Sequence, residues 1–338
     1  MSLSSIAHGV LSTFFSNLFI TLPYPNADLH GQTIIVSGSN TGLGFEASQH
    51  LSRLGVEKLI MAVRTPSKGE AAKQKILKST GREESSIEVW QLDMDSYDSV
   101  KAFSARVSNT LPRVDAVLAN AGVGFGTFQL SEDNEKNINV NVISTFLLLM
   151  LLLPKLRESA NTFNITPRFT IVNSALHYVA PLKELDLNSN LGIFERLNNP
   201  STSNMDARYS LSKLLVVYAV REFAQRTKGE KSMVIVNTPN PSFCKSGLID
   251  NMASGNTVAM RLSEKLIARS TEMGSRALVH GVISGPETNG QYLTNCHNQT
   301  PSSSVTSAKG ARIQKKFYDE LMAKLAKIAP EISSAGYV

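Results

Sequence analysis

Cysteine is scarce in this chain, which has 338 residues and two cysteines, Cys244 and Cys296. Two cysteines are too few for a disulfide framework, and their spacing matches no CxxC motif for metal binding or redox exchange. The sequence therefore predicts no metal site. A reduced, cytoplasmic setting fits this composition.

Clusters of like charge and long hydrophobic runs are also missing. Lys and Arg number 34 against 28 Asp and Glu, a net charge of +6, but the basic residues are spread along the chain. A nucleic-acid groove needs a clustered basic surface, so no nucleic-acid partner is expected. The most apolar stretch, TFLLLMLLLP at 145–154, has about half the length of a membrane span and predicts a buried core helix.

The segment 1–28 has no charged side chain before its last residue. Apolar residues recur there every four positions, as in an amphipathic helix, at Ile6, Val10, Phe14 and Leu18. Polar residues interrupt it too often for a membrane span, and no Lys or Arg precedes the apolar stretch as in a signal peptide. Three roles stay open: docking on the chain's own body or on a second subunit of a homo-oligomer, peripheral contact with a membrane, and a cleaved or anchoring signal.

From residue 29 onward, β-branched runs alternate with segments of helical periodicity. The expected strands are 32–38, 57–64, 86–93, 114–122, 168–175 and 232–239. The expected helices are 44–55, 66–80, 96–109, 135–156 and 209–226. This alternation predicts one α/β domain over 29–300, a doubly wound parallel sheet of the Rossmann type with helices on both faces. Residues 301–338 are expected to form a loop and a last amphipathic helix.

A glycine-rich loop, SGSNTGLG, joins the first strand to the first helix. Its glycines are Gly38, Gly42 and Gly44, and Ser39, Asn40 and Leu43 lie between them. A bare backbone before a helix N-terminus can accept a pyrophosphate, so these six residues are expected to bind a dinucleotide. The spacing is GxxxGxG rather than GxGxxG, and no lysine follows it to hold a triphosphate.

The second strand ends in Arg64 where an NAD site usually has Asp or Glu. An arginine pairs with a 2′-phosphate, whereas an acid repels it, so the sequence favours NADP.

The run ARYSLSKLLVVYAV places Tyr209 and Lys213 four residues apart, on one face of a helix. Alone, such a pair is more often a solvated helix face. Ser174 follows a predicted parallel strand, however, and strand ends form the ligand crevice of this fold. An ammonium one turn away is expected to favour the phenolate of Tyr209 and so to ease proton transfer. His177 fits a pocket wall or a structural histidine better than an acid or base.

Together these residues resemble the short-chain dehydrogenase/reductase family, most of all its retinol-dehydrogenase-like branch, which includes fungal natural-product ketoreductases. The likeness covers about 29–292. By this resemblance the catalytic residues are Asn141, Ser174, Tyr209 and Lys213. It further implies cofactor contacts from Asp93, Asn120, Ala121, Gly122, Pro241 and Ser246, besides those of the glycine loop, Arg64, Tyr209 and Lys213.

The resemblance also implies that Lys213 holds the nicotinamide ribose and that Asn141 anchors a water that leads protons to it. The chain departs from the family pattern at Ser37, Ala119 and Ser242, where Thr, Asn and Gly are usual.

The expected function is an NADP-dependent interconversion of a carbonyl and an alcohol on a bulky lipophilic small molecule. Two alternatives stay open, a redox-neutral isomerase or cyclase on the same scaffold and a catalytically silent NADP-binding protein. The apolar segment 246–275 is expected to close over the substrate, with Gly247, Gly255 and Gly274 as flexible points. The alternative, which stays open, is that its apolar residues pack a helix onto the body or onto a second subunit.

Overall fold

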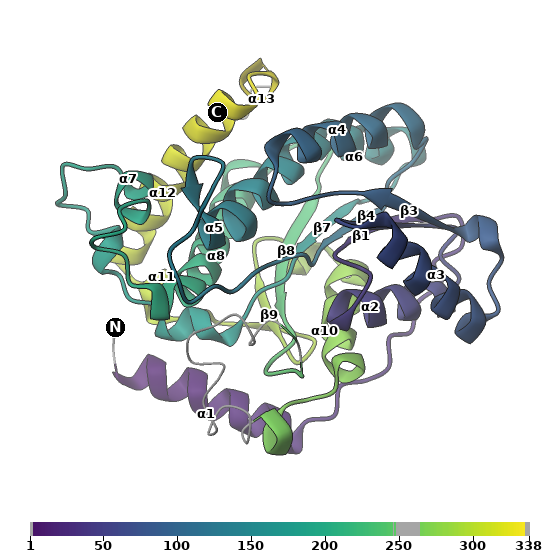
Figure 1. Cartoon of the computed structure of the whole chain (residues 1–338), viewed down its shortest axis with the longest axis horizontal. Helices are drawn as coiled ribbons and strands as arrows, with labels where there is room; N and C mark the ends of the chain where they lie inside the picture. Colours follow the sequence, from purple (N-terminus) through teal and green to yellow (C-terminus); the bar gives the residue numbers. More distant parts are fainter. Residues whose placement is uncertain (1–2, 246, 248–263, 335–338) are drawn as a thin grey trace.

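The computed structural model describes residues 3–245, 247 and 264–334 (Figure 1). Within them, eight strands form one sheet in the order β10-β9-β8-β7-β4-β1-β2-β3. The strands are β1 Thr33–Ser37, β2 Lys58–Val63, β3 Ile87–Gln91, β4 Ala116–Ala119, β7 Arg168–Ile171, β8 Ile235–Asn240, β9 Tyr292–Thr294 and β10 His297–Gln299. All neighbours pair in parallel except β10, which is antiparallel to β9. The predicted doubly wound α/β fold is confirmed.

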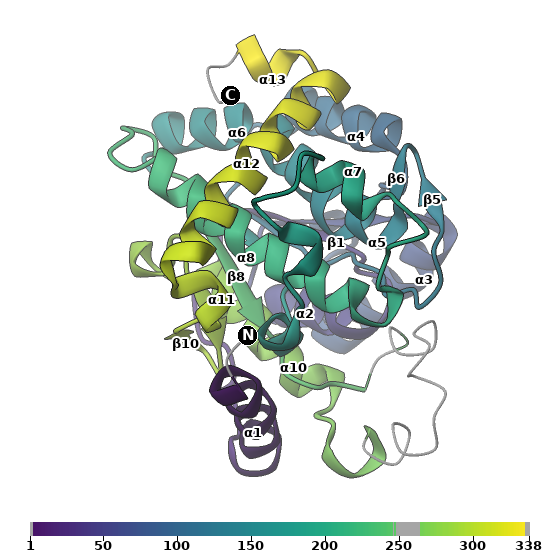
Figure 2. The same cartoon turned by 90° about the vertical axis from the view of Figure 1, so that its left-hand side faces the viewer.

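Helices cover both faces of this sheet (Figures 1 and 2). One layer contains α2 Gly42–Arg53, α3 Pro66–Thr80 and α10 Thr271–Ile283. The other layer contains α4 Tyr97–Thr110, α6 Thr145–Phe163 and α8 Arg208–Arg226, with α12 Ala308–Ile328 packed on α8. Every residue of β1 is buried, as are five of the six in β2, which explains why these strands are continuous β-branched and aliphatic runs.

The apolar stretch at 145–154 lies in α6, as predicted. Among the described residues one helix, Lys136–Phe163, is long and apolar enough to cross a membrane, but 89% of its apolar window is buried inside the protein. It is therefore a core helix. It contains a π-helical turn, Asn139–Ser144, between the short α5 Lys136–Ile138 and α6, and the sequence pattern did not indicate this turn.

Other short elements were also not predicted. They are β9, β10, the hairpin of β5 Leu130–Ser131 with β6 Asn134–Glu135, α7 Ile193–Leu197, α11 Ser303–Thr306 and α13 Glu331–Ser334. The expected loop at 302–307 thus contains the helix α11. Strands and helices of two to five residues are too short to give a period, so the pattern could not reveal them.

The N-terminal segment forms α1 Leu3–Phe19, which lies at the margin of the molecule outside both helix layers (Figures 1 and 2). It packs near the turn that follows β7. The helix was expected from its apolar stripe, but Phe14 and Leu18 of that stripe are exposed. The helix contacts the body through its polar side.

Ser246 and residues 248–263 of the expected lid lie outside the described residues. Within the described part of that segment, Gly274 is buried inside α10 rather than at a flexible point. A Cβ at Gly274 would lie 2.3 Å from the Cys244 sulfur, so this glycine permits close packing of α10 on the loop after β8.

The segment 172–207 between β7 and α8, which we call the insertion, is fastened by a buried ionic network around Arg208. The Arg208 Nη2 atom lies 2.7 Å from a Glu184 carboxylate oxygen, and its Nε lies 3.5 Å from Glu135 Oε2. Arg208 and Glu135 are fully buried and Glu184 nearly so. Burial raises the pKa of both carboxyls, and the guanidinium opposes this rise by favouring their charged forms. The network holds the insertion beside Tyr209, the next residue in α8.

We predict that Arg208→Met lowers the free energy of unfolding by about 3 to 5 kcal/mol, because two buried carboxylates lose their cation. Denaturant titration measures the change. Arg208→Met/Glu184→Gln should recover part of the loss. As a matched control, Arg226→Met removes a more exposed arginine from the same helix and should cost less than about 1 kcal/mol. Equal losses for the two arginines would contradict the prediction.

Candidate active site

The predicted site residues follow the carboxyl ends of successive parallel strands, an edge that we call the carboxyl edge. The described residues lie as follows: Gly38, Ser39, Asn40, Gly42, Leu43 and Gly44 after β1 or in the first turn of α2; Arg64 after β2; Asp93 after β3; Asn120, Ala121 and Gly122 after β4; Ser174 after β7; Pro241 after β8. Asn141 lies in the π-helical turn, and Tyr209 and Lys213 lie in α8. The fold thus brings these chain segments to one edge.

The glycine loop and the loop after β4 are in close contact through Asn120. Its amide nitrogen donates to the carbonyls of Ser37 at 3.0 Å and Gly38 at 3.2 Å. A Cβ at Gly44 would lie 2.4 Å from that nitrogen and from the Gly38 oxygen, so glycine is required here. Ser37, which stands where threonine is usual, keeps the hydroxyl function, because its Oγ accepts from the Ala121 amide at 3.0 Å.

The N-terminus of α2 has unused polar groups. The hydroxyl of Ser39 is buried and has no hydrogen-bond partner in the described part of the chain. Thr41, the N-cap residue, makes no side-chain cap bond to the first turn among the described residues. Free amides at the positive end of a helix and an orphaned hydroxyl fit a bound phosphate group.

Arg64 is exposed directly beside the glycine loop. The amide of Gly38 donates to the carbonyl of Ala62, two residues before Arg64, at 2.8 Å. Asp93 lies one strand further along, where its carboxylate accepts from the Asp95 amide at 3.0 Å. A cation and an acid therefore flank the loop on the side where the adenosine half of a dinucleotide binds in this fold.

The phenol of Tyr209 lies near the hydroxyl of Ser174. Burial raises the pKa of Tyr209, and the neighbouring Ser174 hydroxyl opposes that rise. This corrects the expectation that Lys213 favours the phenolate. The Lys213 Nζ atom lies 5.5 Å from the centre of the Tyr209 ring, and the apolar surroundings dominate. The phenol is held protonated, beside a hydroxyl that fixes its position.

Lys213 is buried, and its Nζ donates to the carbonyl of Val172 at 2.8 Å. Burial lowers the pKa of Lys213 to about 8. A Cβ at Gly122 would lie 3.9 Å from this Nζ, so the glycine leaves open the approach to the ammonium. The ammonium form of Lys213 is present at neutral pH, but its burial is energetically unfavourable. An additional polar partner would lower this cost.

Asn141 connects the loop after β4 to α8. Its side-chain oxygen accepts from the Val123 amide, and its nitrogen donates to the Val123 carbonyl, both at 2.9 Å. The same nitrogen donates to the Ser212 hydroxyl at 3.0 Å, and that hydroxyl donates to the Tyr209 carbonyl. The Asn141 amide therefore has protein partners for both of its heavy atoms, and it holds α8 against the nucleotide side of the edge.

His177 is a structural histidine. Its ring is buried, with Nδ1 2.9 Å from the Ser174 carbonyl and Nε2 3.3 Å from the Ser302 amide. Because the Ser302 N–H needs an acceptor, Nε2 carries no proton and Nδ1 donates to the carbonyl. Burial accordingly lowers the pKa of His177 to about 4. This neutral ring positions the backbone at Ser174 and takes no part in proton exchange near neutral pH.

Two asparagines that sequence reasoning missed organise the strand ends. Asn173 accepts from the Ser174 amide at 2.7 Å. Asn240 accepts from the amides of Ala175 at 3.2 Å and Ser242 at 2.9 Å. Ser242 has φ +69°, a left-handed conformation that explains why glycine is usual at this position. The sequence signal that could have revealed them is their position just after or at the end of a predicted strand, Asn173 in the run NSA and Asn240 in the run NPS.

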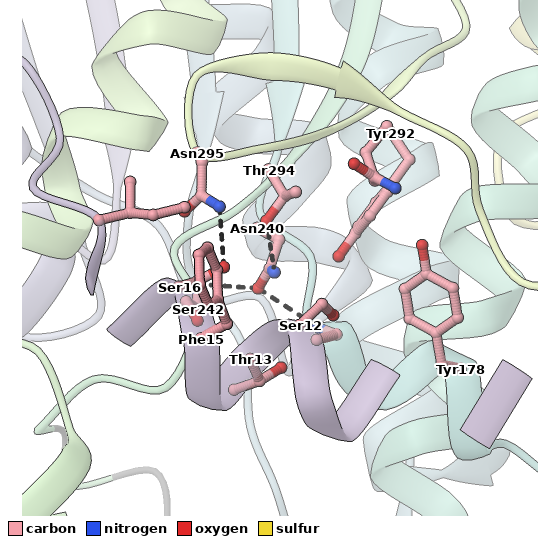
Figure 3. Close-up of a pocket in the computed structure, with 13 residues that line it drawn as sticks. Ser12, Thr13, Phe15, Ser16, Tyr178, Asn240, Ser242, Tyr292, Thr294 and Asn295 are labelled. Carbon is pink, nitrogen blue, oxygen red and sulfur yellow. Dashed lines mark hydrogen bonds between the residues drawn. The ribbon is translucent and has the colours of Figure 1, made fainter. Parts of the chain in front are cut away.

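A cavity of about 160 Å³ lies between α1, the turn that follows β7 and the ends of β8 and β9 (Figure 3). Figure 3 shows Ser12 and Ser16 of α1 on one side and Asn240, Thr294 and Tyr292 on the other. Ala175, Tyr178 and Ser242 also line it. The N-terminal helix therefore forms one wall of a hollow at the carboxyl edge.

The family model of short chain dehydrogenases matches residues 32–167. The short chain dehydrogenase/reductase dmxR8 of Cryptosporiopsis sp. (strain 8999) is 42% identical, over 95% of this chain and 98% of its own length. The chain belongs to the short-chain dehydrogenase/reductase family. A second fungal relative, the short-chain dehydrogenase anuD of Penicillium roqueforti (strain FM164), is 38% identical over 98% of this chain and 87% of its own length. The chain is thus an oxidoreductase of this family, and the resemblance drawn from its motifs is confirmed.

Solved structures agree on the short-chain dehydrogenase fold. An uncharacterised protein from Mycobacterium paratuberculosis has a TM-score of 0.64 at 23% identity, covering 89% of this chain and 95% of its own. A short chain dehydrogenase from Shigella flexneri 2a, complexed with NADP, has a TM-score of 0.55 at 18% identity, covering 80% and 99%.

We predict that Lys213 makes folding stability depend on pH. Its pKa is about 8 in the folded chain against 10.5 for a free side chain. Between these values the unfolded chain binds a proton that the folded chain has released, so the contribution of Lys213 to the free energy of unfolding rises with pH. From about pH 8 to about pH 10.5, the free energy of unfolding of wild type should therefore rise by about 3 kcal/mol relative to that of Lys213→Met. Denaturant titrations at several pH values measure it. Parallel pH dependences of the two proteins would refute this assignment.

Proposed function

We propose that the chain is an NADP-dependent reductase and dehydrogenase that interconverts a carbonyl and an alcohol on a lipophilic small molecule. One observation carries the proposal: the phenol of Tyr209 lies near the hydroxyl of Ser174 and beside the buried ammonium of Lys213 at the carboxyl edge. A proton donor, a fixed hydroxyl and a cation at one place are the groups that carbonyl reduction requires of a protein.

In this mechanism Ser174 and Tyr209 both hold the substrate oxygen by hydrogen bonds. When bound, NADPH supplies the hydride that adds to the carbonyl carbon. As negative charge grows on the oxygen, Tyr209 gives it a proton, which completes the alcohol. Its raised pKa keeps that proton in place until the oxygen becomes basic enough to take it. The ammonium of Lys213, which is charged at neutral pH and lies 5.5 Å from the centre of the ring, offsets only part of the cost of forming the phenolate that burial disfavours.

The residues around the glycine loop support the cofactor assignment. Gly44 and the N-terminus of α2 would receive the pyrophosphate, together with the unpartnered hydroxyl of Ser39. Arg64 would pair with the 2′-phosphate that distinguishes NADP from NAD. A distant structural relative complexed with NADP is consistent with this choice.

The cavity under α1 supports a ring-bearing substrate. Its volume of about 160 Å³ is close to that of a cavity that accommodates benzene. Aromatic rings of Tyr178 and Tyr292 and hydroxyl or amide groups of Asn240 and Thr294 line it together. Such a lining suits an aromatic or alicyclic ring that carries oxygen, as one part of a larger apolar molecule.

The test is a screen of lipophilic ketones and aldehydes with NADPH, in which product mass is measured beside loss of nicotinamide absorbance. A product heavier by two hydrogens, with matching loss of absorbance, is expected. A product of unchanged mass would identify a redox-neutral enzyme, and binding of NADPH without any product would identify a silent protein.

For cofactor choice, Arg64→Ala should weaken NADPH binding by about 1 to 3 kcal/mol, because a charge-assisted contact is lost. NADH binding should hardly change. Calorimetric titration of both cofactors measures this. Lys68→Ala removes an exposed cation one helical turn further on and serves as the control. Equal affinity of the wild type for NADPH and NADH would disprove the assignment.

For the proton donor, Tyr209→Phe should keep the fold and NADPH binding but reduce turnover at least about a hundredfold. Steady-state kinetics on a substrate found in the screen measure this. Tyr218→Phe is a matched control on the same helix, since its hydroxyl binds the Ser304 carbonyl away from the site. Near-normal turnover in Tyr209→Phe would mean that another group donates the proton.

A further inference from the structure

The N-terminal helix α1 is oriented with its apolar side outward. Its exposed large side chains are Leu11, Phe14, Phe15, Leu18 and Phe19, which we call the outer face. They recur at intervals of three and four residues and so form one stripe along the helix. Phe19 is 72% exposed and Leu11 67%. A helix on a water-soluble body normally turns such a stripe toward the core, so this arrangement is reversed.

Polar contacts fix this orientation. Asn17 donates from its amide to the carbonyls of Phe243 at 2.7 Å and Ile267 at 3.1 Å. The buried guanidinium of Arg269 donates to the Ser16 carbonyl at 2.6 Å and to the Ile20 carbonyl at 3.2 Å, which caps the end of the helix. Rolling the outer face inward would break these bonds and leave a buried cation without them.

A further contact holds the middle of the helix. The side chain of Asn295, next to β9, donates to the Ser16 hydroxyl at 2.8 Å (Figure 3). Ser16 is 5% exposed, although it lies among apolar residues that are open to solvent. The polar side of α1 is therefore the side that packs on the protein, and the outer face is free to contact an apolar surface outside the protein.

The residues around the outer face favour a lipid bilayer as the surface that it contacts. No charged side chain occurs in residues 1–27, and Leu266, which is 67% exposed, directly precedes the residue whose carbonyl Asn17 binds. Lys245 and Lys265, both exposed, lie two residues from the carbonyls of Phe243 and Ile267. Phenylalanine and leucine next to lysine complement the acyl boundary and the anionic headgroups of a bilayer.

We propose that α1 lies in the plane of an anionic lipid bilayer, with its outer face inserted and its polar side holding the enzyme. Its 17 residues are too few to span the hydrocarbon core, and its end is tied to the body by Arg269. The cavity on the opposite side of α1 then lies one helix away from the membrane surface, where lipophilic compounds accumulate. The docking itself does not rest on the proposed function.

The test is sedimentation of the full chain with phosphatidylcholine vesicles that contain about a third phosphatidylserine. Wild type should pellet with them, and Phe15→Ser/Phe19→Ser should bind at least about tenfold more weakly. Leu130→Ser/Leu191→Ser removes two exposed apolar side chains elsewhere and should bind as wild type. Lys245→Gln/Lys265→Gln should lose about tenfold, and only when phosphatidylserine is present. Thermal unfolding checks that every variant is folded.

A second readout uses fluorescence. Trp90 is the single tryptophan and is buried, so it gives a constant background. In the Phe15→Trp variant, the fluorescence of the indole introduced at position 15 should shift to shorter wavelength when vesicles are added. Wild type that stays in the supernatant, or a Phe15→Ser/Phe19→Ser variant that pellets equally, would overturn the proposal. The proposal would also be overturned if wild type were a dimer in the absence of lipid and Phe15→Ser/Phe19→Ser were a monomer. That result would assign the outer face to contact with a second copy of the chain.

Discussion

The site depends on one contact, the amide of Asn120 against the carbonyls of Ser37 and Gly38. It joins the ends of β1 and β4 so closely that Gly44 cannot carry a side chain. From this contact the loop continues through Gly122 to Val123, which Asn141 holds against Ser212 in α8. The proposed nucleotide side and the proposed catalytic helix are thus parts of one hydrogen-bonded assembly.

Three buried cations show what this architecture demands. Lys213, Arg208 and Arg269 are each at most 6% exposed and each lies where different elements meet. A buried charge is tolerated only where polar groups surround it. Each cation therefore holds the polar groups that bind it, and the chain segments that carry them, in fixed positions. Arg208 orders the insertion with Glu184, and Arg269 orders α1 with backbone carbonyls. Lys213 has a single backbone acceptor in the described chain and is the least compensated of the three.

The local signals in the sequence predicted much of the fold. The strands β1, β2 and β4 are runs of mostly buried β-branched or aliphatic residues, β3, β7 and β8 each contain a shorter run of this kind, and the loop from Gly38 to Gly44 follows the first strand, so their type and order could be read directly. What depended on distant partners could not. β9 has three residues and is a strand because it pairs with β8 and β10. The π-helical turn at Asn141 leaves no periodic signal.

The same limit applied within the site. The residue types of Ser174, Tyr209 and Lys213 indicated proton chemistry, but the direction of the Tyr209 pKa shift depends on burial, which a spacing of four residues does not reveal. The orientation of α1 was unpredictable for a similar reason. Its apolar period predicts an amphipathic helix, but the partners of its polar side, Arg269 and Asn295, lie more than 250 residues away in the chain.

That separation has a consequence for biosynthesis. A ribosome makes α1 before the residues that orient it, which lie between Phe243 and Asn295 and emerge only after most of the sheet has been translated. Until then nothing prevents the helix from turning its phenylalanines toward any apolar surface, including the unfinished core. Docking of α1 is therefore among the last steps of folding, and its long loop closure is slow compared with helix formation. Chaperones or a nearby bilayer that shield this segment during synthesis would favour correct folding.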